Sequence, residues 1–113
     1  MDEQPKISVI TPLFNRIDLI GKSIDSVVSQ KYREWEMIIV DDGSTDESVK
    51  YVQMRAKNDD RIKIYERHRQ PKGASTCRNI GISKALGKYI IFLDSDDLLA
   101  SHCLDQRINI FNR

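Results

Sequence analysis

Four short runs of apolar residues, mostly β-branched or aromatic, divide the chain, and helical patterns fill the intervals between them. The runs are Ile7–Pro12, Met37–Val40, Ile62–Tyr65 and Tyr89–Leu93. Short runs of this composition are typical of buried strands. Regular alternation of strands with helices is typical of a parallel sheet with helices on both faces. We therefore predict an α/β fold, with the last run buried on both faces and the first ended by Pro12, which cannot continue a central ladder.

The helical patterns between the runs carry apolar stripes at helical spacing. The first two stripes are Ile20, Ile24, Val27 and Val28, then Val49, Val52 and Ala56. Ser44 and Glu47 have the spacing of a capping box, so we predict that the second helix begins at Ser44 and ends at 58–60. The third helix is predicted over 74–86, with a small inner face of Ala74, Cys77, Gly81 and Ala85, and with Gly87 as its C′ terminator. A fourth is predicted from about Ser101, with Leu104, Ile108 and Phe111 on one side.

Length and composition indicate one compact domain over residues 1–113, which we expect to be truncated at its C-terminus because the sequence stops inside an amphipathic helix. A net charge of +1 argues against a nucleic-acid-binding surface. No apolar run approaches the roughly 18 residues that span a bilayer. Cys77 and Cys103 lack the spacing of a metal or redox pair, so two reduced thiols and a cytoplasmic location are expected, with the inner face of the membrane as an open alternative.

Acidic residues follow the last apolar run directly. In an extended backbone Asp94 and Asp96 point the same way while Asp97 points away. Two convergent carboxylates suit a hard divalent cation such as Mg²⁺ or Mn²⁺, completed by the phosphates of a substrate. The alternative is a solvated turn with a helix N-cap.

Polar residues also follow the first two runs, at 12–15 and 41–44. If the sheet has the order 3-2-1-4, the winding reverses between strands 1 and 4, and these loops converge with 94–97 on one crevice. The chain has neither Gly-x-Gly-x-x-Gly nor Gly-x-x-x-x-Gly-Lys. We therefore expect phosphate to be held through a metal and not through a glycine-rich loop.

Four segments taken together resemble family 2 glycosyltransferases of the GT-A fold. They are 9–15 (VITPLFN), 38–46 (IIVDDGSTD), 73–81 (GASTCRNIG) and 93–97 (LDSDD), in order over nearly the whole chain. The resemblance implies a Rossmann-like GT-A half with strand order 3-2-1-4. It also implies an inverting transfer of sugar from a nucleotide-diphosphate-sugar, usually a uridine one, to a saccharide or lipid acceptor, with Mn²⁺ or Mg²⁺ as cofactor.

The resemblance also implies roles for individual residues. Pro12, Phe14 and Asn15 would line the base and ribose, and Asp42 would accept the uracil N–H, which is sensible because an ionised acid is acceptor-only. Asp94 would contact ribose or metal, and Asp96 would be the principal metal ligand. Arg78 and Asn79 lie on the helix that would close the nucleotide pocket.

Most of these residues have a structural alternative. Phe14 could belong to the core, Asp41 is expected to be a structural cap, and Trp35 is expected to fill the core. Arg78 could neutralise Asp42 or Asp94 or could reach the diphosphate. The cations of the basic loop, Arg67, Arg69 and Lys72, fit a solvated loop better than a phosphate clamp.

Two positions depart from the family pattern. Arg16 follows Asn15 where the family usually has an acid shortly afterwards, with Asp18 as the nearest acid, and Cys77 replaces a frequent alanine. In the family the general base lies beyond the D-x-D strand, so the resemblance implies that it lies beyond Arg113 and that this chain alone binds donor without turnover. Two other functions stay open: a receiver-like phosphotransfer domain, although receivers carry their acidic pair on the first strand, and a nucleotide-binding module without chemistry.

Overall fold

The computed structural model describes the backbone of residues 5–111 and the side chains of residues 5–109. Its centre is a parallel sheet of the strands β1 (Ile7–Leu13), β2 (Trp35–Asp41), β3 (Ile62–Glu66) and β4 (Tyr89–Phe92). Their order is β3-β2-β1-β4, and each neighbouring pair is parallel. The predicted α/β class and strand order are confirmed.

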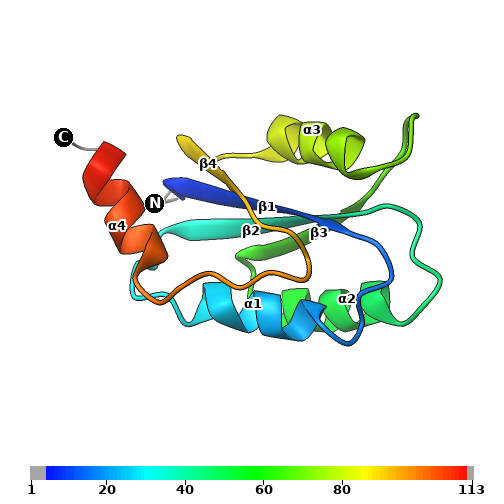
Figure 1. The fold of residues 1–113 in the computed structure, drawn as a ribbon, viewed down its shortest axis with the longest axis horizontal. Helices are drawn as coiled ribbons and strands as arrows, with labels where there is room; N and C mark the ends of the chain where they lie inside the picture. The colour runs from blue at the N-terminus through cyan, green and yellow to red at the C-terminus, as the bar shows by residue number, and fades with distance from the viewer. Residues whose placement is uncertain (1–4, 112–113) are drawn as a thin grey trace.

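Helices cover both faces of the sheet (Figure 1). The helices α1 (Ile20–Val28) and α2 (Ser48–Asn58) lie on one face, and α3 (Ala74–Lys84) lies on the other. The last helix, α4 (Cys103–Phe111), lies at the end of the sheet opposite to the α3 N-terminus. None of the helices among the described residues has the length and apolar character that a bilayer crossing requires.

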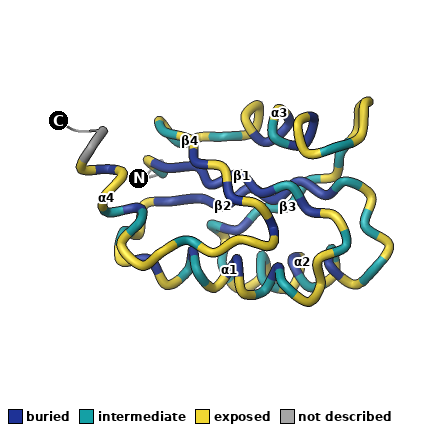
Figure 2. The backbone as a smooth tube through the Cα atoms, in the orientation of Figure 1, coloured by how far each residue is buried: buried dark blue, intermediate teal, exposed yellow. Residues whose placement is uncertain are grey.

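The sheet separates two apolar clusters, and Figure 2 shows that buried residues concentrate in the strands and on parts of the helices. The larger cluster joins one face of the sheet to α1, α2 and α4 and includes Val9, Ile24, Trp35 and Leu104, all buried as predicted. Phe111, which was predicted to join it, lies outside the described side chains. The smaller cluster lies under α3 and consists of Ile10, Ile38, Val40, Cys77 and Ile80.

The small inner face predicted for α3 has a direct cause in the packing. A Cβ atom on Gly81 would lie 2.5 Å from Cγ2 of Ile10, so only glycine lets the helix approach β1 this closely. Of the other three predicted members of this face, Cys77 is buried, Ala85 is half-buried and Ala74 is exposed.

The first strand does not end at Pro12, as the sequence suggested, but continues to Leu13. The carbonyl of Ile10 accepts a hydrogen bond from Leu93 on the β4 side, so the nitrogen two residues later, at Pro12, faces the same side. The pairing of β1 with β4 ends at Ile10 and Phe92. Pro12 therefore removes no ladder hydrogen bond, and β1 still pairs with β2 up to Leu13 and Asp41.

The prediction that the last strand is buried on both faces is wrong. Ile91 is buried, but Ile90 and Phe92 are 36% and 49% exposed. The reason is that β4 is an edge strand and that α3 packs over β1 and β2, which leaves the α3 side of β4 uncovered.

The predicted capping box at Ser44 is also wrong, because α2 begins four positions later, at Ser48. Ser44 instead accepts a hydrogen bond from the backbone N–H of Asn15 in the neighbouring loop. The carboxylate of Asp46 accepts the N–H of Ser48 at 2.9 Å and so satisfies one free donor of the first turn.

Gly87 does not terminate α3, because that helix ends at Lys84 with Ala85 in an extended conformation. A Cβ atom on Gly87 would lie 2.8 Å from the backbone nitrogen of Ser8. Glycine at this position is explained by the close passage of the chain over β1 on its way into β4.

Candidate binding site at the carboxyl edge of the sheet

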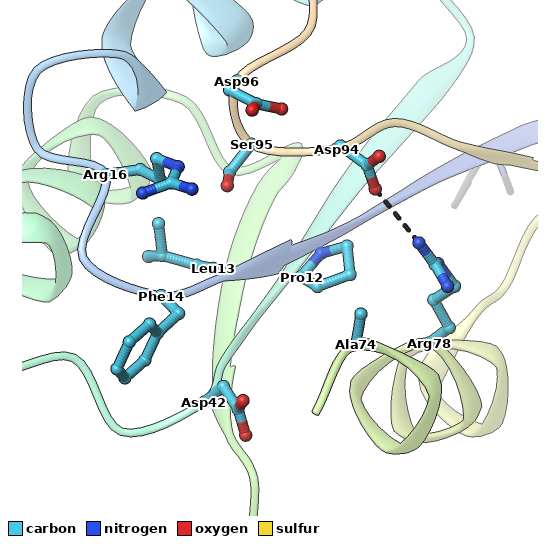
Figure 3. Close-up of a pocket in the computed structure, with 10 residues that line it drawn as sticks. All are labelled: Pro12, Leu13, Phe14, Arg16, Asp42, Ala74, Arg78, Asp94, Ser95 and Asp96. Carbon is cyan, nitrogen blue, oxygen red and sulfur yellow. Dashed lines mark hydrogen bonds and ion pairs between the residues drawn. The ribbon is translucent and has the colours of Figure 1, made fainter. Parts of the chain in front are cut away.

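The loops that follow β1, β2 and β4 meet in one cavity of about 300 Å³ at the carboxyl edge of the sheet. Figure 3 shows Phe14 and Asp42 at one end, Asp94, Ser95 and Asp96 at the other, and Pro12 between them. The remaining lining residues are Leu13, Arg16, Ala74 and Arg78. The predicted convergence of three strand ends on one crevice is therefore what the structure shows.

The loop after β1 presents an aromatic side chain to this cavity. Phe14 is 52% exposed, which removes the alternative that it belongs to the core. An exposed aromatic ring beside a cavity is a flat apolar surface that a planar ligand group could cover.

Asn15 is not among the residues that line the cavity. Its side-chain oxygen accepts the backbone N–H groups of Thr45 and Asp46 at 2.7 and 3.2 Å. Its own backbone N–H donates to Ser44 Oγ, and the residue adopts a left-handed conformation with φ of 48°. Asn15 therefore ties the loop after β1 to the loop after β2.

The two acids after β2 have separate functions in the structure. Asp41 is buried, and its Oδ2 atom accepts the N–H groups of Gly43 and Ser44 at 3.0 Å each, which confirms it as a structural cap. Asp42 lines the cavity and pairs with Arg67, whose Nε lies 2.5 Å from Oδ1. The same oxygen accepts the N–H of Gly73 at 3.2 Å.

Arg67 therefore departs from the expected solvated loop. Its side chain is only 14% exposed, and Nη1 also donates to the carbonyl of Arg69 at 3.0 Å. Sequence reasoning named Arg78 as one possible partner of Asp42 and did not consider Arg67, because no local spacing links Asp42 to a residue at the end of another strand.

Cys77 lies beneath Asp42 on the first turns of α3. Burial raises the pKa of its thiol to about 11, and the neighbouring charge of Asp42 acts in the same direction. Both cysteines are free thiols, as expected.

The acidic segment after β4 is a turn and not an extended strand. The N–H of Asp97 donates to the carbonyl of Asp94 at 3.0 Å, and Ser23 Oγ on α1 donates to the carbonyls of Ser95 and Asp97. The expectation that Asp97 points away is wrong, because the turn brings its carboxylate to those of Asp94 and Asp96.

These three acids suit a divalent cation. One carboxylate oxygen from each lies within 4.8 Å of the other two, and all three residues are exposed. Oxygens bound to one Mg²⁺ at 2.0–2.1 Å lie about 3–4 Å apart, so small rotations of exposed side chains bring the set to ligating distance.

Two arginines face the acids across the cavity. Arg78 Nη2 donates to Asp94 Oδ1 at 3.1 Å, so of the two acids considered for it, Asp94 is the one that it contacts. Asn79, its predicted companion, is exposed and does not line the cavity. Arg16 lines the cavity and takes part in none of the ion pairs formed by the described residues. The sequence singled out Arg16 only as a departure, although its place beside Phe14 was a usable signal.

Residues 8–113 match the protein-family model described as glycosyl transferase family 2. The chain belongs to this family. A curated relative, GalNAc(5)-diNAcBac-PP-undecaprenol beta-1,3-glucosyltransferase of Campylobacter jejuni, is 41% identical over 100 residues, which are 88% of this chain and 32% of the relative.

Two solved structures carry the same fold. Residues 1–349 of S. aureus TarS in complex with UDP-GlcNAc superpose with a TM-score of 0.87 at 28% identity, over 95% of this chain and 31% of TarS 1–349. The mannosyltransferase PcManGT of Pyrobaculum calidifontis, solved with GDP-Man and Mn²⁺, gives a TM-score of 0.82 at 25% identity, over 94% of this chain and 32% of that one. The curated relatives are longer, and this family 2 chain spans between 14% and 42% of their lengths.

Proposed function

We propose that this family 2 chain is the donor-binding part of a glycosyltransferase, and that it binds a uridine-diphosphate sugar together with a divalent cation. The observation that carries the proposal is that Phe14, Asp42 and Asp96, from three different strand ends, line one cavity. The bound nucleotide sugars named for TarS and PcManGT support a donor of this class.

In the proposed complex the base lies against Phe14, and the carboxylate of Asp42 accepts a ring N–H. The cavity extends from there past Pro12 to Asp94 and Asp96 (Figure 3), which gives the ribose and diphosphate a place between the base and the acids. Asn15 contributes by fixing the loop that carries Phe14.

The acids Asp94, Asp96 and Asp97 would hold Mn²⁺ or Mg²⁺. When bound, the cation would neutralise negative charge on the leaving diphosphate. Arg16 and Arg78 provide further positive charge on the same cavity, and Arg78 can exchange Asp94 for a phosphate oxygen once the acids hold a cation.

For the whole protein we propose an inverting transfer to a saccharide or lipid acceptor. The acceptor hydroxyl forms a bond to the anomeric carbon while the bond to the diphosphate breaks, and a general base takes the hydroxyl proton. The undecaprenol-linked glycan in the name of the C. jejuni relative supports an acceptor of this class.

Thermal unfolding with uridine diphosphate and Mn²⁺ tests donor binding. A ligand at a hundredfold its Kd stabilises the native state by about 2.7 kcal/mol, which raises the Tm of a domain of this size by roughly 10 °C or more. Asp96→Asn should abolish the Mn²⁺-dependent part of the shift, and Phe14→Ala should reduce the nucleotide-dependent part.

Asp60→Asn is the matched control, because Asp60 is an exposed acid that does not line the cavity. Its shift should equal that of the wild type. An unchanged Tm with both ligands, or equal shifts in wild type and Asp96→Asn, would contradict the proposed function.

A further inference from the structure

Two N–H groups bind the carboxylate of Asp42, and both donate to the same oxygen. Both N–H groups that bind it, Arg67 Nε at 2.5 Å and Gly73 N at 3.2 Å, donate to Oδ1. A carboxylate oxygen accepts about two hydrogen bonds, so Oδ1 is filled and Oδ2 receives neither donor.

Arg67 is held firmly in this arrangement. Its side chain and that of Asp42 are 14% and 15% exposed, and its Nη1 atom is fixed by the carbonyl of Arg69. A charge-assisted hydrogen bond this shielded from water restricts rotation of the Asp42 carboxylate.

The number of free oxygens matters because bases differ in their donors. The Watson–Crick edge of uracil presents one donor, the imide N–H, between two carbonyls. The corresponding edge of guanine presents two adjacent donors, the ring N–H and the exocyclic amine, which match a carboxylate with both oxygens free. A buried donor left without an acceptor is costly.

We propose that Arg67 is a specificity-determining positioning residue, which fills one oxygen of Asp42 and so selects a base with a single imide donor over guanine. The inference rests on the proposed nucleotide site and deepens it. The same fold accommodates a guanosine donor in PcManGT, so the choice of base depends on the residues around the site and not on the architecture.

The test compares three nucleotides in displacement titrations with Mn²⁺ present: uridine, guanosine and inosine diphosphate. Inosine has the size of guanosine but lacks the exocyclic amine, so this pair isolates the second donor. The wild type should prefer uridine diphosphate, and inosine diphosphate should bind more tightly than guanosine diphosphate. In Arg67→Gln the preference for uridine over guanosine diphosphate should fall about tenfold, and guanosine should overtake inosine.

Two variants separate this role from a merely structural one. Arg67→Lys keeps a charged donor for Oδ1 and should retain most of the preference. Arg69→Gln removes a neighbouring exposed cation but keeps the carbonyl that binds Arg67, so it should bind all three nucleotides as the wild type does. In an Asp42→Asn background, Arg67→Gln should not change base preference further, because Arg67 acts through Asp42.

The outcomes are distinguishable. If the wild type binds no nucleoside diphosphate, the proposed function itself fails. If it binds uridine diphosphate but Arg67→Gln weakens all nucleotides equally, or if guanosine outcompetes inosine in the wild type, only the role of Arg67 is overturned. It is also overturned if no purine nucleotide binds any variant, since pocket size would then account for selection. A Tm and a circular dichroism spectrum of each variant verify folding, and the wild-type comparison of inosine with guanosine stands without any variant.

Discussion

The pKa of the Cys77 thiol depends on the burial of this side chain and on the charge of Asp42, which lines the cavity. Burial and the charge of Asp42 raise its pKa to about 11, so at pH 8 about one molecule in a thousand carries the reactive thiolate. We expect a maleimide at pH 8 to modify Cys103 and to leave Cys77 intact until the chain unfolds.

Mass spectrometry of the native protein checks this, with Cys77→Ser and Cys103→Ser identifying which thiol has reacted. Denatured protein should gain two labels. Fast labelling of the native Cys103→Ser variant would show that Cys77 is accessible and would contradict the buried site.

At the scale of residues, the sequence located the side chains but not the directions in which they point. The sequence pattern correctly placed Asn15 at the carboxyl edge of the sheet. The left-handed backbone at this residue turns its side chain toward Thr45 and away from the cavity. The predicted direction of the Asp97 side chain was wrong because the segment forms a turn and not an extended strand. The pairing of Arg67 with Asp42 depends on the register of β2 with β3, which local spacing does not encode.

At the scale of elements, the contact between α3 and β1 depends on Gly81. An alanine there would place its Cβ 2.5 Å from Ile10 Cγ2, a side-chain atom buried in the apolar cluster under α3. Overpacking costs typically 1–3 kcal/mol, and the better helix propensity of alanine offsets only part of it. We expect Gly81→Ala to lower the free energy of unfolding by about 1–2 kcal/mol in urea denaturation.

Gly21→Ala is a matched control on α1. Its Cβ would approach the hydroxyl of Tyr51, at 2.8 Å, which is the far end of a half-buried side chain that can shift. That variant should stay within about 1 kcal/mol of the wild type. Equal losses in the two variants would show that the close contact of α3 with Ile10 is not what requires glycine.

The order and type of the eight elements in residues 5–111 followed from the sequence pattern, whereas several boundaries did not. Ser44 and Gly87 carry local signals for a helix start and a helix stop. Both residues make tertiary contacts instead. Ser44 accepts a hydrogen bond from the N–H of Asn15, and Gly87 packs against Ser8. The exposed face of β4 was not predicted, because an apolar run does not show which strand lies at the edge of a sheet.

At the scale of the whole molecule, one buried acid ties the sheet together at the edge opposite to the cavity. Glu36 on β2 has a side chain that is 2% exposed, and Lys63 on β3 donates to its Oε1 at 2.8 Å. Ser8 on β1 and the N–H of Leu86 both donate to Oε2 at 2.6 Å. Burial opposes the charge, but these hydrogen bonds outweigh it and hold the pKa of Glu36 below its ordinary value of 4.5.

An acid with a lowered pKa in the folded state stabilises the fold above its unfolded pKa and loses that contribution as the pH falls through the folded value. We expect Glu36→Gln to lower the free energy of unfolding by about 2 kcal/mol at pH 7, since it removes one partner of a shielded ion pair. Below pH 4.5 the difference from the wild type should shrink steadily. Thermal unfolding of both proteins from pH 7 to pH 3 measures it.

Glu47→Gln removes an acid that is 71% exposed and should change stability by less than about 0.5 kcal/mol at every pH. A Glu36→Gln deficit that is constant with pH would show that shape, and not charge, accounts for the loss.

The hydrogen bonds that join Asn15 to residues 44–46 lower the entropy cost of ordering the cavity when a ligand binds. Since they already immobilise the segment carrying Phe14, much of the entropy loss of arranging the cavity occurs during folding and not on association. A nucleotide would then meet a receptor that needs little rearrangement, and its association rate should approach that of a rigid partner.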